Sequence, residues 1–470
     1  MQTKESLAAV RPSPRQLRHT HLAFYAFVHF TVNTFTGREW GDGTESPSLF
    51  LPDHLDCLQW AESIRQAGMK GIILTCKHHD GFCLWPSQYT DHSVASSPWR
   101  DGKGDVVREL SDACSKTGLA LGIYLSPWDR HEPTYGRGKA YDDYFIHQLT
   151  ELLSNYGPIF SVWFDGACGE GPNGKKQYYD WDRYYATVRS LQPDACISVC
   201  GPDIRWCGNE AGQTRENEWS VVPARMVDTE RIASMSQTQD DPSFRLRPLR
   251  AQDMDLGSYD LVRDEPSMIW YPAEVNTSIR PGWFYHPSED TQVRSLDELK
   301  SIYLRSVGGN ATFLLNIPPT KEGLLSPLDV GRLQELGDWI RQTFTDNLLT
   351  ADSVQASSSM ASHPIRYAVS EDETYWHARD EHPELTLTLP APCTLEYLVL
   401  CEHIALGQRI ESACVEIWNG TWEKVADITT VGSRKILALH GVKASRLRIR
   451  ILSSRTEPTL SFLGLYGKDL

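Results

Sequence analysis

The sequence predicts an α/β fold, namely a (β/α)8 barrel followed by a C-terminal antiparallel β-sandwich. Strand-like and helix-like segments alternate through residues 1–345, as in a barrel built from βα units. Beyond that point the pattern changes to short runs of alternating apolar and polar residues. Polar clusters also follow several strand-like runs, at the ends where barrel enzymes keep their reactive groups.

Eight segments are predicted as barrel strands because each is a short apolar run bounded by turn residues. They cover residues 22–30, 71–76, 119–126, 159–164, 196–200, 218–222, 268–270 and 311–316. Amphipathic runs between and after them predict helices at 57–67, 106–117, 142–156, 181–191, 296–307 and 328–344. No G-x-G-x-x-G motif or P-loop follows any of these strands, which argues against nucleotide binding.

The domain boundary is predicted at a stretch rich in serine and alanine, residues 350–363. Residues 1–348 are assigned to the barrel and residues 349–470 to the sandwich. The sandwich strands are expected at 385–389, 394–400, 414–418, 435–439 and 446–451. This domain is predicted either to bind carbohydrate or to support the barrel.

Composition narrows the class of ligand. The formal net charge of -15 argues against nucleic acid and anionic membranes, which attract basic surfaces. The 15 tryptophans and 19 tyrosines suit sugar binding, because pyranose rings pack their C–H faces on aromatic rings. The 11 cysteines are scattered and do not resemble a disulfide framework or a zinc ribbon. No run is apolar and long enough for membrane insertion.

Asp165 is the carboxylate that the sequence favours for catalysis. It directly follows the apolar run 158–164 and precedes a glycine. A carboxylate in such a place is often only a helix cap or a turn former. Here, however, other strand-like runs also end in polar clusters, at His29, at 77–82 and at 126–129. The carboxyl ends of parallel barrel strands meet at one face, so we expect these groups to share a site.

Cleavage of a glycosidic bond needs two carboxyl groups, one ionised and one protonated. Glu210 is a candidate for the second group, in a loop that also holds Gly208 and Gly212. Glu216 and Glu218 compete with it, because charge crowding beside a tryptophan raises a carboxyl pKa. Residue chemistry leaves the choice among the three glutamates open.

The adjacent histidines His78 and His79 suggest either a metal site or a hydrogen-bonding site. Neighbouring side chains on an extended segment point to opposite sides, so the pair would not chelate one ion. Hydrogen bonding to a polar substrate is therefore favoured, and no metal or other cofactor is predicted. A metal-dependent hydrolase stays an alternative that inhibition by a chelator would reveal. The G-x-S-x-G motif of serine hydrolases is missing.

Several short motifs occur in a fixed order along the predicted barrel. They are Val28-His29-Phe30, the runs 33–41, 77–82 and 124–129, Trp163-Phe164-Asp165-Gly166, and the later runs 282–285 and 316–319. In this order they resemble the α-L-fucosidases of glycoside hydrolase family 29. That resemblance implies a (β/α)8-like catalytic domain with a C-terminal β-sandwich, and hydrolysis of fucosides with retention of configuration.

The resemblance also assigns residues. It implies that Asp165 is the nucleophile. The run 33–41 and the W-x-G-N-E run that ends in Glu210 resemble the branch acting on α-1,3- and α-1,4-linked fucose, which selects Glu210 as acid/base. The implied fucose-binding residues are His29, Glu39, Trp40, His78, His79, Tyr124, Trp163 and Trp283.

The expected partner is a fucosylated oligosaccharide or glycoconjugate, of the branched Lewis type, with no nucleic acid and no membrane insertion. The alternative is a non-catalytic carbohydrate-binding protein on the same fold. The presence of both Asp165 and Glu210 favours the enzyme. We expect a periplasmic or secreted protein whose leader is not part of this chain, although the sequence is also compatible with the cytoplasm.

Overall fold

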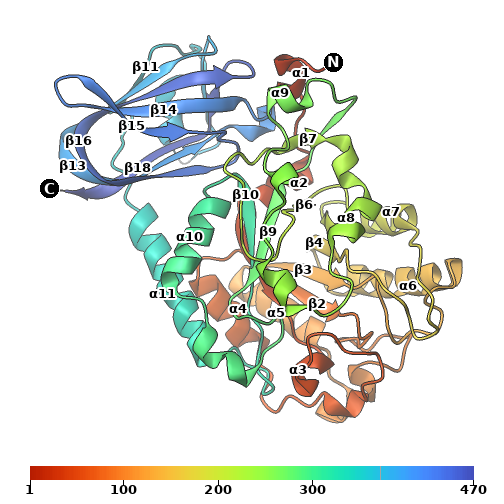
Figure 1. The fold of residues 1–470 in the computed structure, drawn as a ribbon. Helices are drawn as coiled ribbons and strands as arrows, with labels where there is room; N and C mark the ends of the chain where they lie inside the picture. The colour runs from red at the N-terminus through yellow and green to blue at the C-terminus, as the bar shows by residue number, and fades with distance from the viewer. Residues whose placement is uncertain (371, 470) are drawn as a thin grey trace.

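The computed structural model describes residues 1–370 and 372–469. Parallel strands form a curled eight-stranded sheet in the N-terminal part, and helices surround it (Figure 1). Antiparallel strands form the C-terminal part, which packs beside one end of the barrel in Figure 1. The predicted fold class is therefore confirmed.

The barrel sheet is continuous from β5 through β4, β3, β2, β1, β10 and β9 to β6. One isolated parallel bridge, between Ser198 and Ile204, lies between the two end strands β5 and β6. The barrel is thus nearly closed, with a seam at this point. Its strands are β1 (Phe24–Val28), β2 (Gly71–Lys77), β3 (Ala120–Leu125), β4 (Ile159–Phe164), β5 (Cys196–Val199), β6 (Arg205–Trp206), β9 (Ala273–Ser278) and β10 (Ala311–Asn316).

Several helices begin or end where the sequence supplies capping residues. The Asp105 side chain accepts the backbone N–H of Arg108 at the start of α5, and Gly118 ends that helix in the left-handed conformation. The helices are α1 (Lys4–Ala8), α2 (Pro14–Leu22), α3 (Val32–Thr36), α4 (Cys57–Gln66), α5 (Val106–Thr117), α6 (Lys139–Asn155), α7 (Trp181–Leu191), α8 (Thr229–Met235), α9 (Tyr259–Val262), α10 (Leu296–Ser306) and α11 (Pro327–Phe344).

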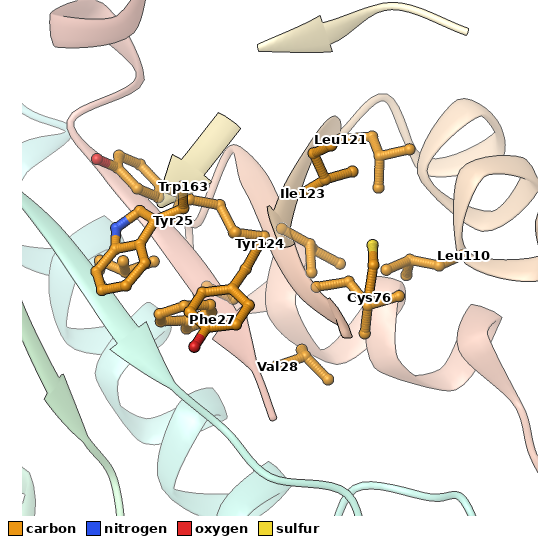
Figure 2. Packing of buried hydrophobic residues seen from close by; sticks show 14 of the residues in the cluster. Tyr25, Phe27, Val28, Cys76, Leu110, Leu121, Ile123, Tyr124 and Trp163 are labelled. Atoms are coloured by element: carbon orange, nitrogen blue, oxygen red, sulfur yellow. The ribbon is translucent and has the colours of Figure 1, made fainter. Parts of the chain in front are cut away.

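The barrel strands are buried on both faces. Figure 2 shows Phe27, Tyr124 and Trp163 together on the inner side, while Cys76 of β2 lies near Leu110 of α5 on the outer side. This double burial explains why the strands are nearly continuous apolar runs. The aromatic layer inside the barrel forms the floor on which the site described below is built.

The sixth and seventh predicted barrel strands were wrong. Segment 218–222 overlaps β7 (Val221–Pro223) and segment 268–270 coincides with β8 (Met268–Trp270); these two strands pair antiparallel with each other outside the barrel. Their apolar side chains pack against α1, α9 and Ile404 of the C-terminal part, so they carry the hydrophobic signal of a buried strand. The strands in the barrel at these places are β6, which has two residues, and β9, whose sequence alternates with polar residues.

The C-terminal part has a core of its own. Five strands follow one another in the order β11, β13, β16, β14 and β15, with β18 paired to β13, and β12 pairs with β17. The segment 350–363, predicted as a linker, contributes β11 to this sheet. The strands are β11 (Val354–Ala356), β12 (Trp376–His377), β13 (Glu384–Cys401), β14 (Ile410–Trp418), β15 (Trp422–Ile428), β16 (Lys435–Ser454), β17 (Thr459–Leu460) and β18 (Phe462–Asp469).

Within the described residues, no helix combines the length and the apolar character needed to cross a bilayer.

Candidate active site

A pocket opens where the barrel strands end. His29, His78, Ser126 and Asp165 directly follow β1, β2, β3 and β4, so one face of the sheet gathers them. The residues that line the pocket are Phe27, His29, Trp40, His78, His79, Tyr124, Trp163, Asp165, Gly166, Ala167, Val199, Trp206, Glu210, Ser236, Gln237, Asn276 and Trp283. Nine of the ten predicted site residues therefore meet here, and the tenth, Glu39, lies behind Trp283.

Asp165 is held at both carboxylate oxygens. The Tyr124 hydroxyl donates to Oδ2 at 2.9 Å, and the backbone N–H of Ala167 donates to Oδ1 at 2.9 Å. The Asp165 side chain is 23% exposed and is among the residues that line the pocket. The structure thus presents an oriented carboxylate that a small ligand can reach.

Glu210 lies on the same pocket in a different chemical environment. Burial raises the pKa of its carboxyl to about 7, and the negative charge of Asp165 acts in the same direction. The indole Nε1–H of Trp283 donates to Glu210 Oε2 at 3.2 Å, which opposes the rise. One pocket therefore contains two carboxyl groups in unlike surroundings, and one of them holds its proton near neutral pH.

The two competing glutamates lie elsewhere. Glu218 is buried and accepts hydrogen bonds from Arg205 and Arg215. Burial opposes ionisation there, but the charges of both arginines hold the pKa of Glu218 below its ordinary value. Glu216 is exposed, and its backbone carbonyl accepts from Thr429 of the C-terminal part. The positions of the three side chains thus distinguish Glu210 from Glu216 and Glu218, a choice that residue chemistry alone left open.

Burial keeps the three pocket histidines neutral, and the contacts of two of them show which ring nitrogen is left to accept a hydrogen bond. Burial lowers the pKa of His29 and of His79 to about 4, and that of His78 also falls. His79 Nδ1 lies 2.7 Å from Ser126 Oγ, and that hydroxyl itself donates to a backbone carbonyl. The proton of His79 is therefore on Nδ1, which leaves Nε2 as an acceptor 3.8 Å from Asp165 Oδ2.

The same logic applies to His29. Its Nδ1 lies 2.7 Å from Asn316 Oδ1, and the amide of Asn316 donates to Ser278 Oγ and to the Trp283 carbonyl. Asn316 Oδ1 must then accept the proton of His29 Nδ1, so His29 Nε2 is also left as an acceptor. The pocket therefore offers hydrogen-bond acceptors beside aromatic surface, a combination that fits hydroxyl donors on an apolar ring.

Glu39 supports the wall that Trp283 forms. Its carboxylate accepts the backbone N–H groups of Trp283 and Phe284, at 2.8 and 3.2 Å, and lies 2.7 Å from His286 Nε2 and 3.0 Å from Arg245. Burial acts against ionisation, but the His286 hydrogen bond and the Arg245 charge hold the pKa of Glu39 below its ordinary value. Its side-chain contacts in the structure are thus to the Trp283 loop and to Arg245.

Residues of the motif runs 77–82 and 124–129 hold the loops that carry the pocket residues. Lys77 Nζ and Asp129 Oδ2 form a fully buried ion pair at 2.9 Å, which ties the end of β2 to the loop after β3. Gly81 has a φ of +80°, and a Cβ there would lie 2.6 Å from Asp129 Oδ1. Only glycine fits this position, and so the backbone turn that follows the two histidines is preserved.

Comparison with known proteins now identifies the family. A family model described as Alpha-L-fucosidase matches residues 14–343. Alpha-L-fucosidase 1 of Arabidopsis thaliana is 41% identical, with 97% of this chain and 87% of that protein covered. The chain belongs to the α-L-fucosidase family, glycoside hydrolase family 29.

Solved structures support the assignment of this chain to the α-L-fucosidase family. A putative α-L-fucosidase from Bacteroides ovatus superposes with a TM-score of 0.86 at 42% identity, covering 99% of this chain and 76% of that one. A Ruminococcus gnavus family 29 fucosidase in complex with fucose superposes with a TM-score of 0.85 at 29% identity, covering 98% and 95%. The family and the α-L-fucosidase activity predicted from the sequence are therefore confirmed.

Several pocket residues of the fucosidase were missed at the sequence level. Trp206 Nε1 donates to Asn276 Oδ1 at 3.0 Å, and both side chains line the pocket. Asn276 lies on β9, which the hydrophobic pattern did not reveal. Trp206 opens the run that ends in Glu210, and this proximity was the available signal. Ser236 and Gln237 follow α8 in a segment without a distinctive motif.

Beneath the pocket of the fucosidase lies a further unpredicted carboxyl group, Glu274. It accepts the indole N–H of Trp163 at 2.7 Å and the hydroxyl of Tyr25. Burial raises the pKa of Glu274 to about 7. Across the described ranges, no group of three or more His, Cys, Asp or Glu side chains is arranged to hold a metal ion.

Proposed function

We propose that the enzyme releases a terminal α-L-fucosyl residue by double displacement, with Asp165 as nucleophile and Glu210 as acid/base. The observation that carries the proposal is the contrast between two carboxyl groups on one pocket: Asp165 is an oriented acceptor, and Glu210 has a pKa of about 7. Retaining glycosidases need such a pair.

In the first step a carboxylate oxygen of Asp165 bonds to the anomeric carbon of fucose while the glycosidic C–O bond breaks. The departing oxygen takes the proton of Glu210, so it leaves as a neutral hydroxyl. In the second step Glu210 removes a proton from water, whose oxygen bonds to the anomeric carbon and displaces Asp165. The sugar is released with retained configuration, and both carboxyl groups return to their initial states.

Fucose recognition would use the surroundings of the two carboxyl groups. Neutral His29 and His79 offer acceptors to the sugar hydroxyls, and the aromatic surface of Trp40, Trp163 and Trp283 would receive the ring and its C6 methyl. One methyl contact contributes on the order of 1–3 kcal/mol to discrimination from galactose, so the hydroxyl contacts must carry most of the affinity.

We further propose a preference for α-1,3- and α-1,4-linked fucose on branched glycans. The support is the resemblance of residues 33–41 and of the run ending in Glu210 to that branch. The segment after β3 also packs on the loop beside Trp40, since Arg130 and His131 contact the carbonyls of Gly41 and Gly43. A neighbouring sugar bound there would transmit binding energy to the transition state.

Asp165→Ala tests the nucleophile. The variant should fold with an unchanged melting temperature and lose turnover, and azide should restore activity by occupying the vacated space as a β-fucosyl azide forms. Proton NMR of the wild-type reaction should show the α-anomer of fucose first. Wild-type turnover in the variant, or the β-anomer first, contradicts the proposal.

Glu210→Ala tests the acid/base. The variant should lose about 10²–10⁴-fold in kcat/KM on a fucosyl oligosaccharide and much less on an aryl fucoside with a good leaving group, which departs without a proton. Glu216→Ala is the matched control, because Glu216 lies six positions along the same segment and is exposed. If Glu216→Ala shows the leaving-group pattern instead, the assignment of Glu210 fails.

A further inference from the structure

A buried group of three charges closes the loop that carries Glu210. Arg205 on β6 and Arg215 each donate to one carboxylate oxygen of Glu218. Their side chains are 4%, 3% and 2% exposed, respectively. The chain thus leaves β6, passes through Glu210 and returns to a fixed point at Glu218. We call residues 205–218 the acid loop and these three side chains the buried triad.

The acid loop is also ordered internally. Asn209 Oδ1 accepts the N–H groups of Ala211 and Gln213, each at 3.0 Å, directly around Glu210. Arg215 donates to Cys207 Sγ at 3.5 Å in addition to Glu218. A displacement of Arg215 therefore disturbs both arms of the loop and, with them, the position of Glu210.

The C-terminal part holds the same anchor from outside the barrel. Gln408, which is fully buried, accepts the N–H of Ser220 at 2.8 Å through Oε1 and contacts the Glu218 carbonyl at 3.4 Å through Nε2. Asn310 donates to the same carbonyl at 2.8 Å and accepts the N–H of Ser433. Both barrel and C-terminal residues thus converge on the backbone of Glu218.

A neighbouring contact strengthens this attachment. The Arg455 guanidinium lies over the Trp219 ring, 4.1 Å from its centroid. Arg455 also donates to the Gly257 carbonyl, so the C-terminal part contacts one residue that precedes β7 in the chain and one that follows it. The segment that follows the acid loop is therefore covered by side chains of the C-terminal part.

We propose that Glu218 and Gln408 are positioning residues for Glu210, so that the C-terminal part acts on the proton-transfer step through the acid loop. This inference rests on the proposed role of Glu210. Because proton transfer needs Glu210 within hydrogen-bond reach of the departing oxygen, a loosened loop reduces that step before it affects sugar binding. Neither Glu218 nor Gln408 lines the pocket, so we expect both to act through Glu210.

The dependence of kcat/KM on the leaving group distinguishes a positioning role from a general loss of stability. Glu218→Gln keeps the shape of the side chain but removes the charge that compensates two buried guanidinium groups. Its kcat/KM on a fucosyl oligosaccharide should fall at least about tenfold, and on an activated aryl fucoside less than about threefold. Gln408→Ala should show the same pattern and carries the test alone if Glu218→Gln does not fold.

The matched control is Asp142→Asn. Asp142 is also a buried carboxylate, 4% exposed, but it accepts from Tyr184 and from Asp180 N–H on the outer side of the barrel. Any effect of Asp142→Asn should be equal on the two substrates. If Glu218→Gln and Gln408→Ala also lower both substrates equally, the positioning role is refuted.

A double variant distinguishes this inference from the proposed function. In Glu210→Ala the leaving-group-dependent effect of Glu218→Gln should disappear, since there is no acid left to position. If Glu210→Ala itself shows no leaving-group dependence, the role of Glu210 fails. If Glu210→Ala shows it and Glu218→Gln does not, only the positioning role fails.

Discussion

The raised pKa of Glu210 predicts how the enzyme should respond to pH. With a pKa of about 7 instead of the ordinary 4.5, about nine-tenths of the Glu210 carboxyls are protonated at pH 6, whereas about 3% would otherwise be. The proton is therefore available roughly 30-fold more often at that pH. Because the acid acts in its protonated form, kcat/KM should fall as pH rises through about 7.

The assay compares kcat/KM between pH 5 and 9 on a Lewis-type trisaccharide and on an aryl fucoside with a good leaving group. The trisaccharide should show a basic limb with a midpoint near pH 7, and the aryl fucoside should show a much weaker one. In Trp283→Phe the midpoint should move to higher pH by up to about one unit, because the indole N–H that favours the ionised form is removed.

Two results would refute this reasoning. A basic limb that keeps its midpoint in Glu210→Ala belongs to another group. A midpoint that moves to lower pH in Trp283→Phe means that the indole does not stabilise the ionised carboxylate. Melting temperatures recorded over the same pH range serve as the control, since they separate a change in protonation from unfolding.

Three further predictions concern the pocket. Tyr124→Phe should lower kcat/KM about tenfold, because the 2.9 Å hydrogen bond that orients Asp165 is lost. The control is Tyr185→Phe, which should have little effect because the Tyr185 hydroxyl donates to the Cys200 carbonyl. Equal losses of kcat/KM in the two variants would contradict this prediction. A Lewis trisaccharide should give a higher kcat/KM than 2′-fucosyllactose, and equal values would remove the linkage proposal alone. A chelator should leave turnover unchanged, and loss of activity that zinc restores would contradict the metal-free mechanism.

The sequence predicted the candidate site residues that directly follow uninterrupted apolar strands. His29, His78 and Asp165 each come directly after such a strand, so pattern and motif pointed to the same positions. Strand β9 was missed because its inward residues Glu274 and Asn276 are polar, which removes the hydrophobic signal. Those residues are polar because they contact Trp163 and Trp206 inside the barrel.

The choice of acid/base shows a second limit of the sequence. Three glutamates lie close together in the chain; Glu210 was a candidate through its glycine-containing loop, and Glu216 and Glu218 through charge crowding beside a tryptophan. The structure distinguishes them by their side-chain partners, which are the distant Trp283 for Glu210 and the nearby Arg205 and Arg215 for Glu218. Local composition could not supply this distinction, because ionisation depends on tertiary contacts.

The seam between β5 and β6 lies between the strands that present Asp165 and Glu210, while pairing through β9 and β10 joins β6 to β1 on the other side of the barrel. His29, His78, Tyr124 and Asp165 belong to strands β1–β4, which are joined by continuous parallel pairing. Glu210 follows β6 across the seam, where side-chain contacts with Trp283 and the buried triad position it. We therefore expect that acid-loop residues other than Glu210 and the buried triad can be changed while the strands that present the histidines keep their register. A library built on residues 211–214, with Trp206, Asn209, Glu210 and the buried triad retained, should vary the leaving group that the enzyme accepts and leave its sugar specificity in place.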